Sequence, residues 1–529
     1  MFRKSVISNI QVVLTFILFI LILFTLKTKA LASEYFVNSI SGNDSNPGTS
    51  INTPWKSLAK VESTNLKPGD IVNFARGSSW AKATWESVFV IDNSGTKDNP
   101  VTFRAYGEGE LPTFSNGGQV WNKGIKITGS YVLIEELKVI NTGYCGFEIS
   151  KNTSNNIIRK CEVENCGMGI LCYGSNCLLT ENYIHNLKMI VDNEIPDTQS
   201  GGGDFGCVSF WLYGPDNEIS YNKCIDNIGH SFDYITDGGF IEFYENCNGT
   251  YAHHNWVENG NGIAEGSNGT GKNVTISYNV FIENGGFFAL HTNSFSVDSF
   301  KFENNTCINK KGTLWNNMFN FYPGDNIAGK VIVRNNIFVL GGKSTEQVSK
   351  SNNFIHTNNL YYLLDGARLG TFTLGDGEKT TDPNFLDIEN NDFRLKEGSP
   401  AIDAGIDLEY KTDFNNKTVP FGKAPDLGAY EYETFTGTSL LESGAQKKFF
   451  MLWPNPASNS FNLKVNSISE QKLNLKIFNL IGQTVYSENF KSETDETLTI
   501  PVYANLTPGT YKVTLNNGIN RFTDTLIVQ

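Results

Sequence analysis

The sequence contains few charged residues, and fewer basic than acidic ones. Charged residues make up 18% of its 529 residues, against roughly 25% in average usage. Its 42 lysines and arginines stand against 55 aspartates and glutamates, which gives a formal net charge of −13. A nucleic-acid or anionic-membrane partner requires a basic face. We therefore expect neither kind of partner.

Several chemical motifs are also missing. The six histidines have no zinc-type spacing, and the sequence contains no Ser-His-Asp arrangement, phosphate loop or nucleotide fingerprint. The nine cysteines are scattered and odd in number. We expect most of them to be small core residues, with Cys172 and Cys177 as the candidates for one disulfide.

Long apolar runs are confined to the N-terminus. Arg3 and Lys4 precede an apolar run from Val12 to Leu26, and Ala30-Leu31-Ala32 supplies the small residues of a signal peptidase site. We expect residues 1–32 to be a signal peptide cleaved after Ala32. The alternative is an uncleaved membrane anchor, because the run is long for a signal peptide. No second stretch approaches spanning length, so we expect no membrane span after processing.

What the sequence does contain is a repeat. Segments of alternating apolar residues with asparagines recur with a period of mostly 23 to 33 residues, at 157–165, 178–186, 219–227, 251–259, 276–284, 300–309 and 331–340. Between them lie short apolar segments that open with glycine, at Gly146, Gly169, Gly206, Gly239, Gly262 and Gly286. Such short strands cannot pair within one repeat and must stack on the next. In-line asparagines at the bends can hydrogen bond along that stack.

This pattern predicts an all-β fold, a parallel β-solenoid. A β-propeller is the alternative, but it needs four longer antiparallel strands per repeat of roughly 40 residues. The stretches Tyr35-Phe-Val, Asn46-Pro-Gly-Thr and Pro54-Trp-Lys-Ser-Leu-Ala-Lys resemble the opening of secreted right-handed parallel β-helix proteins of the pectate-lyase-like superfamily. Asp382-Pro-Asn-Phe and Gly398-Ser-Pro-Ala-Ile-Asp-Ala-Gly resemble their closing segment. We expect this domain to cover residues 33–432, with a short amphipathic helix from Trp55 to Val61 capping its open end.

A second domain follows a linker at residues 433–449. Trp453-Pro-Asn-Pro-Ala-Ser and Leu506-Thr-Pro-Gly-Thr-Tyr-Lys-Val resemble the C-terminal sorting domain of the type IX secretion system of Bacteroidota. Alternating segments predict a small β-sandwich of about seven strands over residues 450–529; an adhesive β-sandwich module is the alternative. The resemblance implies a partner, the type IX machinery, and a secreted or surface-attached protein from which this domain is removed.

Acidic residues gather between residues 204 and 265. In the strand that begins at Phe240, alternation predicts that Ile241 and Phe243 face inward and that Phe240, Glu242 and Tyr244 face outward. Alignment of the glycine-opened segments places Glu265 directly above Glu242, about 4.8 Å away. Two carboxyls that close cannot both ionise cheaply, so one pKa should rise or a cation should lie between them.

Such a pair fits a glycosidase, in which one acid protonates the leaving oxygen and one carboxylate activates water or attacks. We expect a monomeric enzyme that cleaves a polysaccharide. The predicted catalytic residues are Asp237, Glu242 and Glu265, assisted by Asp204 and Asp233. The predicted substrate-binding residues are His253, His254, His291, Trp211, Tyr234 and Tyr244. A hydrolase needs no cofactor; Ca²⁺ at Asp204, Asp233 and Asp237 is the possible exception. These outward acids are also compatible with simple solvation or a structural Ca²⁺.

Two other functions stay open. Polysaccharide lyases need a base and a cation to neutralise a uronate. However, no arginine occurs between Arg159 and Arg334, and where related lyases carry a catalytic lysine and arginine this chain offers Asn268 and Leu290. A Ca²⁺-assisted lyase would use Lys223, Lys272, His253 or His254 as its base. The third function is a non-enzymatic, glycan-binding adhesin.

Overall fold

The computed structural model describes residues 32–433 and 450–528, except residues 84, 118–119, 195, 197–202, 233, 313–317, 323–326, 343–351, 370–372, 454–460, 466–470, 480–482, 493–497, 503–505, 508 and 517–520. Contacts divide the chain into two units, residues 1–434 and 435–529. The predicted signal peptide, apart from Ala32, and all of the predicted linker except Glu433 lie outside the described residues. Within the described ranges, no helix combines the length and the hydropathy needed to cross a membrane.

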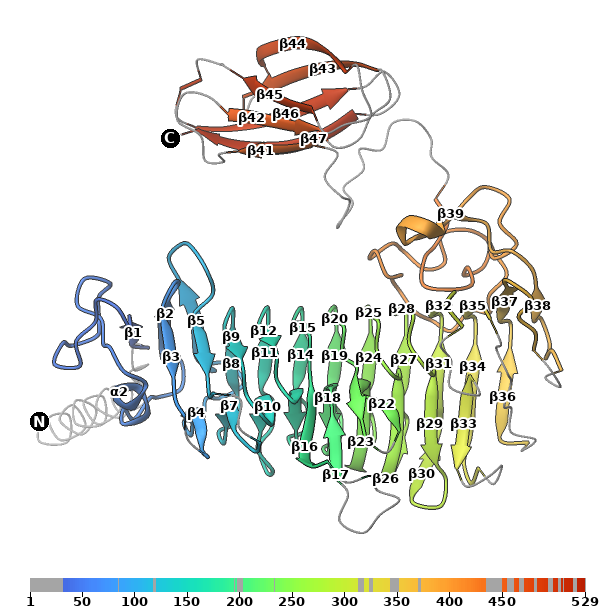
Figure 1. Cartoon of the computed structure of the whole chain (residues 1–529), viewed down its shortest axis with the longest axis horizontal. Helices are drawn as coiled ribbons and strands as arrows, with labels where there is room; N and C mark the ends of the chain where they lie inside the picture. The colour runs from blue at the N-terminus through green and yellow to red at the C-terminus, as the bar shows by residue number, and fades with distance from the viewer. Residues whose placement is uncertain are drawn as a thin grey trace, which may run out of the picture. The chain divides into compact units, whose positions relative to one another are not determined.

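The first unit is a parallel β-helix of three long sheets (Figure 1). The first sheet contains β1 (Glu34–Val37), β2 (Ile71–Ala75), β5 (Val101–Tyr106), β8 (Val132–Glu135), β11 (Ile157–Arg159), β14 (Leu178–Thr180), β19 (Glu218–Ser220), β24 (Tyr251–His253), β27 (Thr275–Ser277), β31 (Phe300–Glu303), β34 (Val331–Arg334) and β36 (Phe354–Thr357).

The second sheet contains β3 (Ser79–Ala81), β6 (Thr113–Ser115), β9 (Lys138–Ile140), β12 (Glu162–Glu164), β15 (Tyr183–His185), β20 (Lys223–Ile225), β25 (Trp256–Glu258), β28 (Val280–Ile282), β32 (Thr306–Asn309), β35 (Ile337–Leu340), β37 (Leu360–Leu363) and β38 (Lys379–Thr380). The third sheet contains β4 (Ser87–Ile91), β7 (Lys123–Ile127), β10 (Cys145–Ile149), β13 (Met168–Cys172), β18 (Val208–Leu212), β23 (Gly239–Asn246), β26 (Ala264–Lys272), β29 (Phe288–His291), β30 (Phe295–Asp298) and β33 (Phe319–Tyr322).

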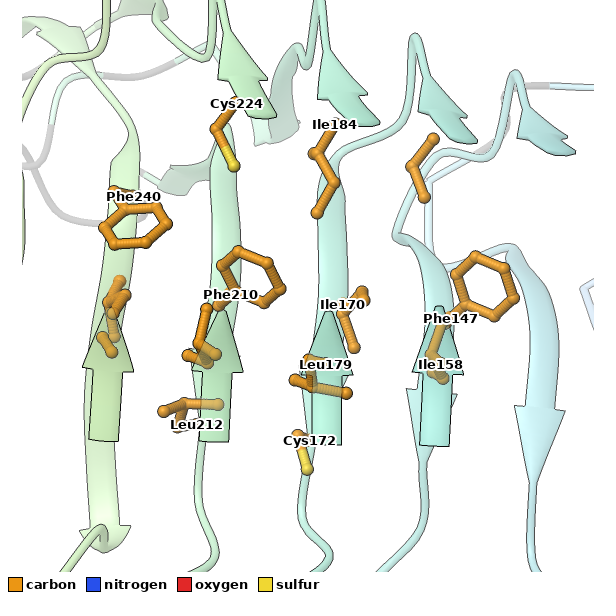
Figure 2. Packing of buried hydrophobic residues seen from close by; sticks show 14 of the residues in the cluster. Phe147, Ile158, Ile170, Cys172, Leu179, Ile184, Phe210, Leu212, Cys224 and Phe240 are labelled. Atoms are coloured by element: carbon orange, nitrogen blue, oxygen red, sulfur yellow. The ribbon is translucent and has the colours of Figure 1, made fainter. Parts of the chain in front are cut away.

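Most coils contribute one strand to each sheet, and these strands pair in parallel with the equivalent strand of the next coil. Phe147, Ile170, Phe210 and Ile241 are successive register partners in the third sheet and all are buried. Figure 2 shows inward side chains of neighbouring coils packing against one another. The predicted solenoid is therefore confirmed, and the parallel pairing excludes the propeller.

Buried asparagines link the coils at one bend, as predicted. In each step the side-chain Nδ2 donates to the Oδ1 of the asparagine in the next coil, at 2.9 to 3.1 Å. This asparagine ladder consists of Asn182, Asn222, Asn255, Asn279, Asn305, Asn336 and Asn359. Every member is 0–1% exposed, so the ladder satisfies backbone and side-chain groups that water does not reach.

The cysteine prediction is half right. All nine cysteines are buried, as expected of small core residues, and all nine are free. The expected Cys172–Cys177 disulfide is wrong, because the two thiols hydrogen bond to each other as separate groups.

The N-terminal end of the β-helix carries a short helix, α2 (Leu58–Glu62), that buries Leu58 and Val61. The prediction started this helix at Trp55, three residues too early. Trp55 is instead held in extended backbone, because its N–H donates to the Phe36 carbonyl at 2.8 Å and its carbonyl accepts from Asn38 N–H at 2.8 Å. Ser57 is the residue that starts the helix, since its Oγ accepts from Lys60 N–H.

The segment after β38 folds back over the outside of the second sheet. It includes β39 (Phe385–Asp387), the 3₁₀ helix η1 (Ile388–Asn390) and β40 (Asp392–Leu395). Phe393, Leu395 and Leu427 share one buried cluster with Ile308 and Ile337. This closing segment, residues 382–432, therefore covers outward apolar residues of the last coils.

The second unit is a small sandwich, as predicted. One sheet contains β41 (Phe450–Trp453), β42 (Phe461–Val465) and β45 (Leu498–Val502), and the other contains β43 (Gln471–Phe478), β44 (Thr484–Ser492), β46 (Gly509–Asn516) and β47 (Arg521–Val528). Side chains of both sheets, among them Leu463 and Leu475, form one buried cluster.

Candidate functional site

The candidate site lies on the outward face of the third sheet, where neighbouring strands align chemically useful residues. Trp211 of β18, Glu242 of β23 and Glu265 of β26 are successive register partners. The alignment of Glu265 on Glu242 is therefore as the repeat predicts. Ile241 and Phe243 are buried in the core on either side of Glu242, which directs Glu242 outward.

Phe240 departs from the predicted alternation. It is 0% exposed and packs in the core against Phe210 and Phe281, with ring centroids 5.6 and 5.9 Å apart. The reason lies in Gly238 and Gly239, whose φ angles of 116° and 149° reset the chain just before the strand. Regular alternation therefore starts only at Ile241, and the outward placement of Phe240 is wrong.

A serine and a histidine accompany the two glutamates. The hydroxyl of Ser267 lies 3.4 Å from Glu242 Oε1 and 3.3 Å from Glu265 Oε1. His291 of β29 places its Nε2 3.0 Å from Glu265 Oε1. Ser267 reaches this place because β26 has a bulge, in which it is the extra residue between the partners of Phe243 and Tyr244.

The electrostatics of the pair are asymmetric. Burial raises the pKa of Glu242 well above its usual range, and the negative charges of Glu265 and Asp237 raise that pKa further. The side chain of Glu265 is 38% exposed and contacts His291. The arrangement thus favours a protonated carboxyl at Glu242, which is the state that a general acid requires.

Two hairpins leave the coils before β18 and before β23. The first is β16 (Met189–Asn193) with β17 (Gly203–Gly206), and the second is β21 (Gly229–Ser231) with β22 (Ile235–Asp237). Asp204 joins them: its Oδ1 accepts from Ser231 Oγ at 3.3 Å and its Oδ2 accepts from Phe232 N–H at 2.7 Å. Asp204 therefore positions the second hairpin.

The second hairpin delivers Asp237 to the acid pair. Asp237 is half-buried, its Oδ1 accepts from Gly238 N–H at 2.7 Å, and its charge acts on Glu242. Asp233 lies outside the described residues. The predicted Ca²⁺ ligands Asp204 and Asp237 thus already accept backbone or hydroxyl hydrogen bonds. The Ca²⁺ site at these residues stays a prediction.

The one group of three potential metal ligands found among the described residues lies elsewhere. Glu162, Glu164 and His185 place ligand atoms within 4.8 Å of one another on the second sheet. Lys138 Nζ lies 2.7 Å from Glu162 and 2.8 Å from Glu164. An ammonium group therefore already balances these carboxylates.

His253 and His254 do not join the acid pair, so their predicted role at one common site is corrected. They lie at the end of β24, in the first sheet, and both are buried. Regular strand alternation would place these neighbours on opposite faces, but His254 has a left-handed φ of 56°, and the two Nδ1 atoms lie 2.8 Å apart. His254 Nε2 contacts the Asp413 carbonyl at 2.7 Å, and burial lowers its pKa to about 4.

Three tyrosines form a stack, and Tyr244 is the one of them that was predicted as a substrate-binding residue. Ring centroids are 4.5 Å apart between Tyr173 and Tyr213 and 5.3 Å apart between Tyr213 and Tyr244. Trp211 packs beside this stack and is 8% exposed. Most ring faces in this stack are therefore covered by other rings. Tyr234, at the second hairpin, is 68% exposed.

The candidate bases of a lyase lie apart from the glutamates. Lys223 of β20 is in the second sheet, with its Nζ 5.6 Å from the centre of the Tyr183 ring. Lys272 is the exposed last residue of β26. Sequence reasoning also missed Ser267 and Tyr173. Tyr173 was detectable, since it ends the glycine-opened segment that aligns with Trp211, but no sequence signal marked the bulge at Ser267.

Comparison with known proteins gives two family matches. The family described as "Pel9A-like, right handed beta helix region" matches residues 35–335. The "Secretion system C-terminal sorting domain" matches residues 451–529. The first match agrees with the predicted right-handed β-helix, and the second with the predicted sorting domain.

Individual relatives are more distant. A lacto-N-biosidase of Bifidobacterium longum subsp. longum is 34% identical over 142 residues, which are 22% of this chain and 9% of that protein. The chain thus matches less than a tenth of this relative's length. Pectate lyase Pel9A is 16% identical with a TM-score of 0.48, over 76% of this chain and 98% of that chain. A GH136 lacto-N-biosidase from Eubacterium ramulus is 15% identical with a TM-score of 0.42, over 66% and 67% of the two chains.

Proposed function

Because the chain belongs to the Pel9A-like right-handed β-helix family, we propose that it is a polysaccharide-degrading enzyme in which Glu242 and Glu265 hydrolyse a glycosidic bond. Both glutamates lie within the matched residues 35–335. The C-terminal sorting domain marks the chain as a secreted or cell-surface protein of Bacteroidota. An exported enzyme of this kind therefore acts on a glycan outside the cell.

The observation that carries the proposal is the register pairing of Glu242 with Glu265, together with the raised pKa of Glu242. In this proposal Glu242 holds a proton and donates it to the leaving oxygen. Glu265, oriented by His291, attacks the anomeric carbon and later leaves when water enters. Asp237 acts through Glu242, because its charge holds the proton there.

The spacing favours retention of configuration. Retaining glycosidases separate their carboxyls by about 5–5.5 Å, whereas inverting enzymes need about 6.5–9.5 Å to admit a water molecule. Register partners in neighbouring strands are about 4.7–4.9 Å apart. The Ser267 hydroxyl lies within 3.4 Å of an oxygen of each glutamate. Both observations support a short separation.

Elimination on a uronate polymer is the second candidate, and the family match favours it, because Pel9A, after which the family is named, is a pectate lyase. Elimination needs a base and a cation beside the sugar carboxylate. Lys223, Lys272, His253 and His254 lie apart from the acid pair, as described above. The acid pair therefore supports hydrolysis over elimination.

The test is the chemistry of the products. The protein is incubated with lacto-N-tetraose, polygalacturonate, rhamnogalacturonan and alginate, and both new reducing ends and the ultraviolet absorbance of unsaturated uronates are recorded. Hydrolysis releases reducing ends without absorbance. Absorbance that grows with the reducing ends would establish elimination instead, and binding without either product would establish an adhesin.

A further inference from the structure

Two buried histidines, His253 and His254, take no part in the proposed reaction, and they form one continuous chain of polar contacts. Their Nδ1 atoms lie 2.8 Å apart. On one side, His253 Nε2 lies 3.2 Å from Glu218 Oε1. On the other side, His254 Nε2 lies 2.7 Å from the carbonyl oxygen of Asp413. Each of the four ring nitrogens therefore has a partner within hydrogen-bond distance. We call these two residues the histidine pair.

The partners determine where the protons of the histidine pair lie. A backbone carbonyl can only accept a hydrogen bond, so His254 Nε2 carries a proton. Burial lowers the pKa of His254 to about 4, so above that pH its Nδ1 holds a lone pair, and the proton between the two rings belongs to His253. The hydrogen bond from His253 lowers the pKa of Glu218, and a carboxylate also only accepts. All three contacts are therefore satisfied only when His253 carries two protons, as an imidazolium.

The other titratable groups around the histidine pair are tyrosines and carboxyls. Burial raises the pKa of the tyrosines whose rings contact the pair, which are Tyr221, Tyr251 and Tyr278. Burial also raises, to about 6 or 7, the pKa of three carboxyls in the closing segment, Asp413, Asp426 and Glu431. Glu303, two register positions beyond His253, is paired with Arg334 at 2.8 Å. Since His254 is already neutral, a proton that leaves the pair as the pH rises leaves His253.

The histidine pair lies where the closing segment contacts the first sheet. Next to the bond between His254 and Asp413, the Phe414 ring stacks on the His254 ring, with centroids 6.4 Å apart and planes inclined by 10°. Tyr221 Oη donates to Asn416 Oδ1 at 2.8 Å. Residues 413–416 are thus attached to bends that precede them by more than 150 residues in the sequence.

Loss of one proton sets two of these contacts against each other. A neutral His253 has a single N–H for two acceptors, and a hydrogen bond to a carboxylate is roughly twice as strong as one between neutral groups. With its proton on Nε2, toward Glu218, His253 turns a lone pair toward the lone pair of His254 Nδ1. Whether His254 then moves away or shifts its own proton to Nδ1, its bond to the Asp413 carbonyl is lost.

We propose that the second proton of His253 is a pH-sensitive link between the first sheet and the closing segment. Residues 413–416 stay attached while His253 is an imidazolium, and they detach when that proton leaves as the pH rises. The link concerns the attachment of the closing segment and does not depend on the proposed function.

Nitrogen NMR of protein labelled at histidine tests the protonation states directly. The chain has six histidines, and His253→Gln and His254→Gln identify the signals of the pair. At pH 6 we expect protons on both nitrogens of His253 and on Nε2 alone of His254. A His253 with one protonated nitrogen at that pH, or a doubly protonated His254, would overturn the proposal.

Glu218→Gln tests the link itself, because it removes the need for the second proton. The amide of the new side chain can donate to Nε2 of a neutral His253, whose one N–H then serves His254. The matched control is Glu181→Gln, an exposed glutamate on the same bend one coil earlier. Hydrogen exchange of residues 413–416, corrected for the intrinsic rate, is measured from pH 6 to pH 9. We expect protection to fall at least tenfold more in the wild-type protein and in Glu181→Gln than in Glu218→Gln.

The comparison isolates the link, because all other titratable groups of the closing segment are the same in these proteins. An equal fall in Glu218→Gln and the wild-type protein would overturn the proposal. Protection that does not fall in the wild-type protein would overturn it as well, because Glu218 would then turn into solvent and leave the contact between the histidines intact. If Glu218→Gln fails to fold, the protonation states and the exchange of the wild-type protein still decide.

Discussion

Glu242 and Glu265 occupy equivalent positions on neighbouring coils but have different surroundings. Burial raises the pKa of Glu242, and the negative charges of Glu265 and Asp237 raise it further. Glu265 contacts a histidine nitrogen at 3.0 Å. The proposed function thus gives the same residue type two roles on one sheet, as paired carboxyls have in glycosidases.

Replacing Asp237 tests this electrostatic argument. The Asp237→Asn variant removes a negative charge that raises the pKa of Glu242, so that pKa should fall. Because a general acid must be protonated, activity is lost above its pKa. We therefore expect the basic limb of the kcat/KM profile to move to lower pH.

The control for this prediction is Glu245→Gln. Glu245 is exposed on the same strand and pairs with Lys151 at 3.0 Å. Its charge is not among those that act on Glu242, so the basic limb should stay in place. An Asp237→Asn profile that is unmoved, or moved to higher pH, would refute the proposed role of Asp237.

Single residues were predictable from the sequence where strand alternation is regular. The pairing of Glu242 with Glu265 follows from aligning two glycine-opened segments. Phe240 was misplaced because two glycines reset the backbone before it, and Ser267 was missed because a bulge shifts the register by one residue. A pattern of period two does not reveal such local changes of backbone conformation.

At the scale of elements, the asparagine ladder holds the bends of neighbouring coils together. Asn255 lies in the middle of the ladder: its Nδ2 donates to the Ile219 and His253 carbonyls and to Asn279 Oδ1, each at 2.9 Å. Asn255→Leu should lower the free energy of unfolding by at least about 2 kcal/mol, since it leaves several buried polar groups without partners.

Urea denaturation measures this effect, with Asn52→Leu as its control. Asn52 is exposed in a turn, and its replacement should change the free energy of unfolding by no more than about 0.5 kcal/mol. Similar losses in the two variants would show that the ladder adds nothing specific to the stability of the fold.

The closing segment contains three buried carboxyls. Burial raises the pKa of Asp413 and of Asp426 to about 6 and that of Glu431 to about 7. Each of these pKa values lies above its value in the unfolded chain, so the folded segment binds more protons between about pH 4 and 7. The contribution of these carboxyls to its stability should be greatest below about pH 4 and should fall as the pH rises from about 4 to 7.

Hydrogen exchange of residues 413–432, corrected for the intrinsic exchange rate, measures this dependence. Glu431→Gln removes the carboxyl with the highest of the three values and should make the fall with pH shallower. Protection that rises from pH 5 to 8 in the wild-type protein would contradict the prediction.

The repeat predicted the coils well, because the alternation of apolar and polar residues within a strand indicates which of its side chains are buried. The closing segment was recognisable only by its resemblance to related proteins. Its residues pack on the outside of a sheet formed by distant segments of the chain, as Leu427 does near Ile337. His254 is buried against Asp413 because of this packing. The sequence in and around β24 alone does not predict it.

At the scale of the whole molecule, the excess of acidic over basic residues affects both the protein surface and the candidate site. The chain is a β-helix followed by a separate sorting sandwich, and the residues proposed to act on a glycan all lie in the β-helix. Part of the net charge of −13 is concentrated at Asp237, Glu242 and Glu265. There it raises the pKa of Glu242 rather than merely increasing solubility.

The most direct test of this account is the release of reducing ends from the four glycans by the full chain and by its Glu242→Gln and Glu265→Gln variants. The wild-type protein should release reducing ends from at least one glycan. Each variant should lose at least about a hundredfold of that activity, because general acid and nucleophile are each required, while Glu245→Gln should keep it. Full activity in either Glu242→Gln or Glu265→Gln would contradict the account.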